Sequence, residues 1–163
     1  MPDAEAVLSE LGRRHETLGT AESLTGGLVA GAITAVAGAS AVYVGGVVSY
    51  SADVKASVLG VPHDVIASHG TVSSECAEAM AAGARRTLGC DWAVSTTGVA
   101  GPDALEGHPV GTVFVGVAGP AGVSSTQLSL AGDRNAIRRQ SVAAALSALA
   151  EHLGVPREEP PLG

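Results

Sequence analysis

Lys55 is the single lysine of this 163-residue chain, in which eight arginines supply all the other Lys/Arg charge. An arginine keeps its proton near neutral pH, whereas a desolvated lysine loses it and can act as a base. Tyr50 precedes Lys55 by five positions, and Ser40 lies fifteen positions upstream in a Gly-Ala-Ser turn. Because serine is inert until a base takes its proton, we expect Ser40 to be a nucleophile that Lys55 activates directly or through the Tyr50 phenol. These three residues meet only if the chain folds back or if a second subunit contributes. The alternative is that Lys55 is an ordinary solvated surface charge.

A second candidate site is the loop Thr20–Gly27, which links a predicted strand to a predicted helix. The backbone N–H groups of a helix start, freed by Gly26 and Gly27, form a natural site for an anion or a carbonyl oxygen. The alternative is a capping role, in which Ser23 or Thr25 satisfies the first helical turn. The motif does not match a Walker loop.

Two further positions are expected to hold a ligand. Thr97 and Gly98 follow a predicted strand at the point where open α/β sheets bind their ligands, although an ordinary turn is the alternative. Arg134 and Arg138 lie one turn apart on the last predicted helix and share a face. Arg134 is in the first turn, where a cation gains nothing from the helix dipole, so it is a candidate phosphate clamp. An Asp133–Arg134 surface pair is its alternative.

The order of elements indicates the fold class. Helices and strands alternate along most of the chain and a hairpin follows, which predicts an α/β fold: a three-layer α/β/α sandwich with a mixed sheet. We expect one domain over residues 1–154 and a disordered tail over 155–163. The predicted helices are 3–15, 25–36, 52–59, 64–69, 75–88 and 133–153, and the predicted strands are 17–21, 42–50, 92–96, 110–117 and 123–130.

Composition excludes several classes of protein. A formal net charge of −7 argues against a nucleic-acid-binding surface, because such surfaces neutralise phosphates. Cys76 and Cys90 have no metal-ligand spacing and are expected to be buried thiols in a reducing cytoplasm. We therefore predict no metal, no cofactor and a cytoplasmic location. The run from Ser23 to Ala52 carries no charge, but its glycines favour a buried helix, a turn and a buried strand over a membrane span.

Motifs throughout the chain resemble those of one known family. They are Thr20-Ala21-Glu22-Ser23-Leu24-Thr25-Gly26-Gly27, Gly46-Val47-Val48-Ser49-Tyr50-Ser51 with Lys55, Leu59-Gly60-Val61, His69-Gly70-Thr71-Val72-Ser73, Thr97-Gly98-Val99-Ala100-Gly101-Pro102, Pro109-Val110-Gly111-Thr112-Val113 and Gly132-Asp133-Arg134. In this order they are similar to the CinA C-terminal family, over about residues 5 to 153. That family comprises nicotinamide-nucleotide amidohydrolases, and we expect this chain to be a stand-alone form.

The resemblance implies deamidation of nicotinamide mononucleotide to nicotinate mononucleotide and ammonia, in pyridine nucleotide recycling. It implies a serine nucleophile at Ser40, supported by Tyr50 and Lys55, with Thr97 and Arg134 holding the substrate and no metal. The oxyanion would be stabilised by N–H groups near Gly45-Gly46 or Thr25-Gly26. Two departures from the family pattern are Ala52, where an asparagine is usual, and a short loop around Ala104-Leu105-Glu106.

Two other functions stay open at this point. The chain could be an amidase for another small amide, or an inactive nucleotide-binding or interaction module. We expect a small nucleotide as ligand, neither nucleic acid nor membrane as partner, and a homo-oligomer, most simply a dimer.

Overall fold

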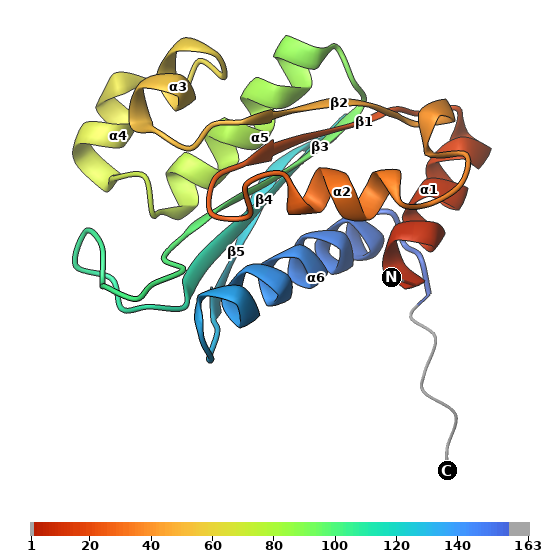
Figure 1. The fold of residues 1–163 in the computed structure, drawn as a ribbon. Helices are drawn as coiled ribbons and strands as arrows, with labels where there is room; N and C mark the ends of the chain where they lie inside the picture. Colours follow the sequence, from red (N-terminus) through yellow and green to blue (C-terminus); the bar gives the residue numbers. More distant parts are fainter. Residues whose placement is uncertain (1, 157–163) are drawn as a thin grey trace.

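The computed structural model describes residues 2–156 and shows a five-stranded sheet with helices on both faces (Figure 1). The strand order is β2-β1-β3-β4-β5, where β1, β2 and β3 are parallel and β4 is antiparallel to both of its neighbours. This is the predicted α/β/α sandwich with a mixed sheet, so the fold prediction is confirmed. The strands are β1 Leu18–Glu22, β2 Tyr43–Val48, β3 Trp92–Gly98, β4 Thr112–Gly119 and β5 Gly122–Ser129.

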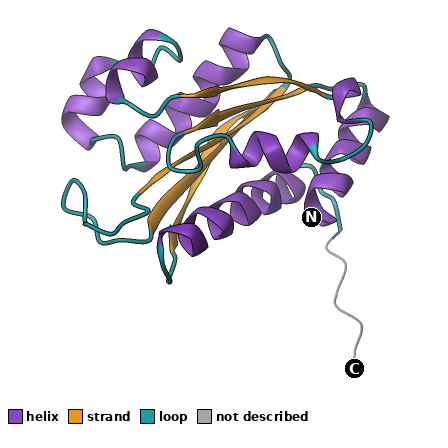
Figure 2. Cartoon of the chain, viewed as in Figure 1, coloured by secondary structure: helices purple, strands orange, loops and turns teal. Residues whose placement is uncertain are grey.

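The helices divide into two layers, one on each face of the sheet (Figures 1 and 2). On one face, α1 (Pro2–Arg14), α2 (Leu28–Thr34) and α6 (Arg134–His152) enclose the larger apolar core. On the other face, α5 (Ser74–Leu88) packs against the sheet, and α3 (Ala52–Ser57) and α4 (His63–His69) lie beside it. The core is built from alanine, valine, leucine and isoleucine with few aromatic rings.

The topology determines where a ligand can bind. The chain leaves β1 through α2 on one face and returns to the edge as β2, and it then crosses the other face through α5 to reach β3. The carboxyl ends of β1 and β3 therefore lie side by side where the connections diverge, which is the position at which open α/β sheets bind ligands. Glu22 and Thr96 are register partners at this edge.

The predicted elements are all present, with shifted ends. The helix predicted from Thr25 begins only at Leu28, because Gly26 and Gly27 have positive φ angles of 57° and 104° that no helix accepts. The predicted hairpin forms with Pro120 and Ala121 in its turn. Of the predicted disordered tail at 155–163, residues 157–163 lie outside the described part of the chain.

The uncharged run Ser23–Ala52 differs from the prediction of a buried helix and a buried strand. β2 is an edge strand whose residues alternate between half-buried and exposed, and α2 buries only Val29 and Ile33. The prediction was wrong because apolar composition does not show whether a strand lies at the centre of a sheet or at its edge. Among residues 2–156, no helix is long and apolar enough to cross a membrane.

Two helix glycines test how tightly the layers pack. A Cβ on Gly83 in α5 would overlap the carbonyl oxygen of Leu59, whereas a Cβ on Gly12 in α1 would meet nothing closer than Val42 Cγ2 at 3.8 Å. We expect Gly83→Ala to lower the free energy of unfolding by about 1–3 kcal/mol. Gly12→Ala, the matched control, should raise it by about 0.5 kcal/mol. Urea denaturation measures both; equal effects would contradict this packing.

Candidate active site

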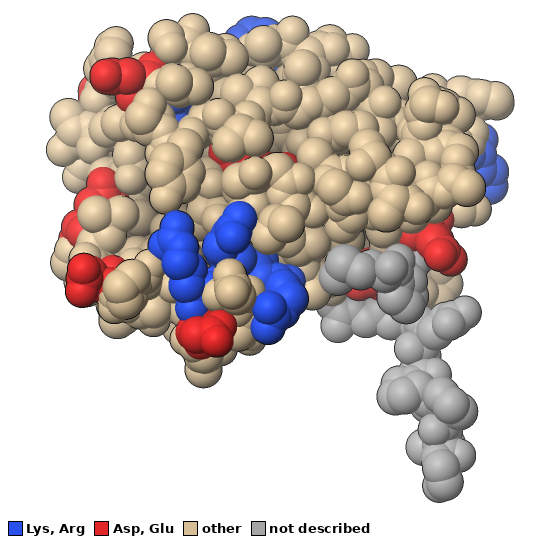
Figure 3. Space-filling model, in the orientation of Figure 1, with Lys and Arg blue, Asp and Glu red and all other residues tan. Residues whose placement is uncertain are grey.

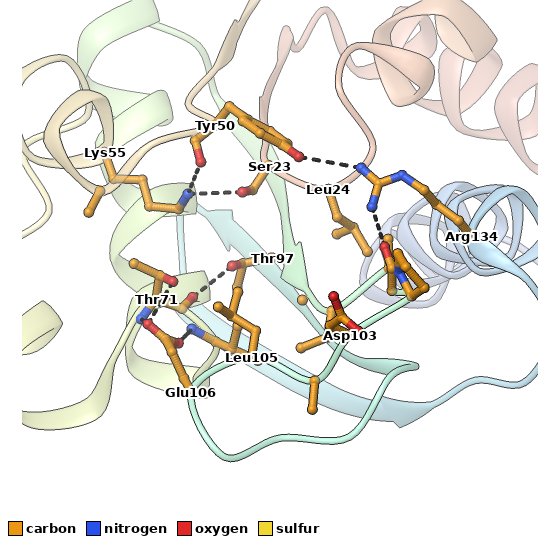
Figure 4. A pocket seen from close by; sticks show the side chains of 18 residues that line it. Ser23, Leu24, Tyr50, Lys55, Thr71, Thr97, Asp103, Leu105, Glu106 and Arg134 are labelled. Atoms are coloured by element: carbon orange, nitrogen blue, oxygen red, sulfur yellow. Dashed lines mark hydrogen bonds between the residues drawn. The ribbon is translucent and has the colours of Figure 1, made fainter.

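A cavity of about 460 Å³ opens at the carboxyl ends of β1 and β3 (Figure 4). The turn that follows β1 supplies Ser23, β3 supplies Thr97 and Gly98, and Lys55 comes from α3 on the opposite face of the sheet from α2. Arg134, in the first turn of α6, closes one side. The other lining residues are Leu24, Tyr50, Ala52, Thr71, Val72 and the loop Val99–Glu106.

Lys55 is buried, with 2 % of its surface exposed, and its amine is hydrogen-bonded to three oxygen atoms. Its Nζ donates to the hydroxyl of Ser23 at 2.9 Å, to the carbonyl of Ser49 at 2.7 Å and to the carbonyl of Tyr50 at 3.4 Å. The alternative that Lys55 is a solvated surface charge is therefore wrong. No carboxylate forms an ion pair with this amine in the described part of the chain.

Burial lowers the pKa of Lys55 from the usual 10.5, because desolvation disfavours the charged amine. The nearby Cys76 thiol and Glu106 carboxylate oppose this shift and raise the pKa of Lys55 by a smaller amount. A neutral amine keeps two N–H groups, enough for the carbonyls of Ser49 and Tyr50, and turns a lone pair toward the Ser23 hydroxyl. This geometry is the one that a base for Ser23 requires.

The turn that carries Ser23 is held by the buried carboxylate of Glu22. This carboxylate accepts hydrogen bonds from the N–H groups of Val29 at 2.8 Å and Ala30 at 3.1 Å, and from the hydroxyl of Thr25 at 2.6 Å. It therefore caps α2, a role that the sequence had offered to Ser23 or Thr25. Ser23 is left free to face Lys55. The predicted anion site at this helix start is also wrong, because Glu22 already occupies it.

Ser40 does not meet Lys55 within the chain, so the prediction that the chain folds back to join them is wrong, and the route through a second subunit stays a prediction. Ser40 lies in a short 3-10 turn, Ala39–Ala41, and lines a different hollow with Thr34 and Tyr43. β2 separates this turn from Tyr50, and six strand residues span about 20 Å. The serine that contacts Lys55 is Ser23, and its signal in the sequence was its position directly after the first strand.

Tyr50 lines the cavity, and its phenol is bonded to Arg134 rather than to Lys55. Its backbone carbonyl, not its phenol, contacts the amine, whereas the hydroxyl accepts a hydrogen bond from Arg134 Nη2 at 3.4 Å (Figure 4). The phenol therefore does not contact the Lys55 amine within the chain, and its activating role stays a prediction. Arg134 also donates to the Gly101 carbonyl, so the tyrosine and the loop together aim the guanidinium at the cavity mouth.

Thr97 and the loop that covers it form a connected hydrogen-bond chain. The Thr97 hydroxyl donates to the Thr71 carbonyl at 2.7 Å, and the Thr71 N–H and hydroxyl each donate to Glu106 at 3.0 Å. The Val72 N–H donates to the same carboxylate at 2.8 Å, and these bonds lower the pKa of Glu106 although its desolvation alone would raise it. Sequence reasoning missed Glu106, because nothing in its spacing indicates a partner 35 residues away.

The remaining predicted ligand-binding residues lie outside the cavity lining. Arg138 donates to the carbonyls of Leu24 at 2.9 Å and Thr25 at 3.3 Å, so it braces the Ser23 turn from behind. Gly46 packs against Thr20, where a Cβ would overlap its hydroxyl. The predicted residues that do not line the cavity are Ser40, Thr25, Gly26, Gly27, Gly46 and Arg138; those that do are Tyr50, Lys55, Thr97, Gly98 and Arg134.

Comparison with known proteins agrees with this fold. The family model of the CinA C-terminal domain matches residues 2–153. The chain belongs to this family. A CinA-like protein of Frankia casuarinae is 50% identical over 154 residues, which are 94% of this chain and 36% of that protein. A CinA-like protein of Anaeromyxobacter sp. is 48% identical over 146 residues, 89% of this chain and 36% of that protein.

Solved structures of the CinA superfamily share the fold. The Competence-Damaged Protein (CinA) Superfamily Protein KP700603 of Klebsiella pneumoniae has a TM-score of 0.91 at 36% identity, covering 94% of this chain and 96% of that one. The competence/damage inducible protein CihA of Agrobacterium tumefaciens has a TM-score of 0.89 at 35% identity, covering 94% of both chains. The chain spans about a third of the length of the CinA-like relatives.

The single lysine allows a direct test of the buried amine. With ¹³C,¹⁵N-labelled lysine, NMR should show one side-chain resonance that titrates below 10.5 in the folded chain and near 10.5 in urea. Glu106→Gln removes a negative charge, so it should move the titration to still lower pH. Asp103→Asn, in the same loop, is the matched control and should move it less. A folded-state titration at or above 10.5 would contradict the buried, neutralisable amine.

Proposed function

We propose that the chain hydrolyses the carboxamide of nicotinamide mononucleotide to give nicotinate mononucleotide and ammonia, with Ser23 as nucleophile and Lys55 as its base. The observation that carries this proposal is the buried contact of 2.9 Å between Lys55 Nζ and Ser23 Oγ at the ligand-binding edge of the sheet. A nucleophile and a base within hydrogen-bond reach are the signature of covalent catalysis. Family membership is consistent with amide hydrolysis but does not by itself specify the reaction.

The reaction proceeds in two halves that reuse the same pair. Lys55 takes the Ser23 proton as Oγ attacks the carboxamide carbon, and the resulting ammonium returns that proton to the departing nitrogen, so ammonia leaves. Water then attacks the acyl-serine, Lys55 accepts its proton, and Ser23 regains a proton as the acid is released. The carbonyls of Ser49 and Tyr50 hold the amine in both states.

The cavity suits a ligand that carries one positively and one negatively charged group. Nicotinamide mononucleotide has a cationic pyridinium ring and an anionic phosphate. Asp103 and Glu106 line the loop side of the cavity, and Arg134 lines the side formed by α6. Figure 3 shows arginine side chains gathered on this part of the surface beside a small acidic group. An arginine is suited to phosphate because its planar guanidinium donates two parallel hydrogen bonds.

Thr97 has a specific role in this scheme. Its hydroxyl proton is committed to the Thr71 carbonyl, so only its lone pairs remain for a ligand. Such an oxygen accepts a hydrogen bond from the –NH₂ of a carboxamide, but it offers no donor to the carboxylate of the product. This polarity favours the amide substrate over the acid.

Exchanging the two serines tests the assignment of the nucleophile. Ser23→Ala should reduce ammonia release from nicotinamide mononucleotide about a thousandfold or more, because no other hydroxyl contacts Lys55 Nζ among the described residues. Lys55→Met should reduce it about 10²- to 10⁴-fold, the usual contribution of a general base. Ser40→Ala is the matched control and should be unchanged. Equal losses for Ser23→Ala and Ser40→Ala would refute this assignment.

The phosphate role of Arg134 has its own test. Arg134→Gln should lower kcat/KM for nicotinamide mononucleotide about 10- to 100-fold, the effect of losing a hydrogen bond between charged groups. The same substitution should hardly change the rate with nicotinamide riboside, which has no phosphate. Arg139→Gln, on the same helix but away from the cavity lining, is the control. If the two arginine variants behave alike with both substrates, Arg134 does not bind the phosphate.

A binding module without turnover would give a different result. In that case nicotinamide mononucleotide would raise the melting temperature of the wild-type chain while no ammonia appeared at micromolar protein. An amidase for another small amide would release ammonia from the riboside as fast as from the mononucleotide.

A further inference from the structure

One exposed leucine lies in the cavity itself. Leu105 is 51% exposed and lines the loop side of the cavity together with Asp103 and Glu106. Among the described residues, Tyr50 is the other large hydrophobic side chain that is exposed and lines the cavity, and its hydroxyl is bonded to Arg134. An exposed leucine by itself is ordinary at a protein surface. Leu105 differs because the backbone beside it is strained and fastened in place.

A tight turn holds Leu105. The N–H of Leu105 donates to the carbonyl of His108 at 3.2 Å, and the N–H of His108 donates to the carbonyl of Leu105 at 2.8 Å. The two residues between them, Glu106 and Gly107, have positive φ angles of 52° and 77°. Turns of this kind favour asparagine or aspartate followed by glycine, because a left-handed backbone is unfavourable for most other residues. The turn itself therefore does not explain the glutamate.

The carboxylate of Glu106 explains its position, because it fastens the turn to another segment at the cavity. It accepts hydrogen bonds from the N–H and the hydroxyl of Thr71, both at 3.0 Å, and from the N–H of Val72 at 2.8 Å. We call these three bonds the Glu106 latch. The Thr71 carbonyl accepts the bond from the Thr97 hydroxyl, so the latch ties the turn to the side of the cavity that Thr97 forms.

We propose that Leu105 is a specificity-determining residue that packs on the flat face of the substrate ring, and that Glu106 is the residue that positions it. This inference rests on the proposed function, in which the ring connects a carboxamide at Ser23 to a phosphate at Arg134. Conjugation keeps a carboxamide close to the plane of its ring. A carboxamide between Ser23 and Thr97 therefore brings the ring toward the loop side of the cavity, where Figure 4 shows Leu105 beside Glu106. A leucine on the ring face removes water from it and gains dispersion contacts.

A binding measurement separates the ring contact from the phosphate contact. Ser23→Ala removes the proposed nucleophile, so calorimetry can follow nicotinamide mononucleotide without turnover. In this background, Leu105→Ala should weaken binding about 10-fold, the effect of losing the burial of about half a leucine side chain. It should leave ribose 5-phosphate, which has no ring, unchanged, whereas Arg134→Gln should weaken both ligands. Leu28→Ala, at a 41% exposed leucine outside the cavity lining, is the matched control and should change neither.

The latch has a test that needs no ligand. Glu106→Asn suits the positive φ angle better than glutamate, but its side chain is one carbon shorter and uncharged. Hydrogen exchange at the Thr71 and Val72 amides should therefore become about 10- to 100-fold faster, the effect of losing a hydrogen bond to a charged group. Glu106→Gln keeps the length and should restore part of the protection. Asp103→Asn, in the same loop, is the control and should leave both amides unchanged.

A double variant tests whether Glu106 acts through Leu105. In the Ser23→Ala background, Glu106→Asn should weaken binding of the mononucleotide but not of ribose 5-phosphate. Adding Glu106→Asn to Leu105→Ala should cause little further loss, because a residue that only positions the leucine has no effect once the leucine is gone. A general disturbance of the site would instead weaken both ligands.

Three results would overturn the inference. The first is equal affinity of the Leu105→Ala and Leu28→Ala variants for the mononucleotide, or no binding in the parent. The second is an equal loss for ribose 5-phosphate. The third is unchanged amide exchange in Glu106→Asn or additive losses in the double variant. Ammonia release is measured separately with Ser23 intact: ring-dependent binding without ammonia refutes the proposed reaction alone, and ammonia release without an effect of Leu105 refutes this inference alone.

Discussion

The buried amine of Lys55 is the constraint on which the site depends. A charged ammonium in an apolar interior without a carboxylate partner is strongly disfavoured, so the fold must either neutralise the amine or surround it with acceptors. Here it does both: burial lowers the pKa, and the carbonyls of Ser49 and Tyr50 hold the nitrogen in place. The remaining bond is to Ser23. An arginine at this position would keep its charge and could not serve as a base, which explains why the single lysine of the chain stands here.

Other hydrogen bonds of the site hold the backbone around the contact between Lys55 and Ser23 in place. Glu22 holds the Ser23 turn to the start of α2 from one side, and Arg138 holds it from α6 on the other. Glu106 fixes the loop Gly101–His108 to the backbone of Thr71 and Val72. One buried carboxylate, Glu22, and one exposed carboxylate, Glu106, therefore act as acceptors for backbone N–H groups, not as catalytic acids. Acidic residues near a cavity are easily misread when only their type is known.

The sequence was sufficient for the fold and for part of the site. Periodicity, caps and turns predicted the elements, and the strand–helix alternation predicted the sheet on which Thr97 and Gly98 reach the cavity. Lys55 was identifiable from its uniqueness and Arg134 from its position against the helix dipole. Ser40 does not reach Lys55 within the chain, because the six residues of β2 separate its turn from Tyr50 and the strand does not fold back. Ser23 lies at the cavity because it directly follows β1, and β1 is adjacent to β3 in the sheet. Single-sequence reasoning could not supply this adjacency, since strand order depends on long-range pairing.

The edge strand β2 leads directly into the candidate active site. Ser49 and Tyr50, whose carbonyls hold the Lys55 amine, directly continue β2, so the position of these acceptors depends on how firmly that strand is held. β1 holds it on one side only, and the Ser49 N–H bond to Glu22 is the last backbone bond before the strand diverges toward α3. A strand paired on both sides fluctuates less than an edge strand, because its backbone groups are bonded in both directions. The bonds from the Lys55 amine to the Ser49 and Tyr50 carbonyls therefore also tie the end of this edge strand to α3, so the amine and the backbone that holds it fix each other.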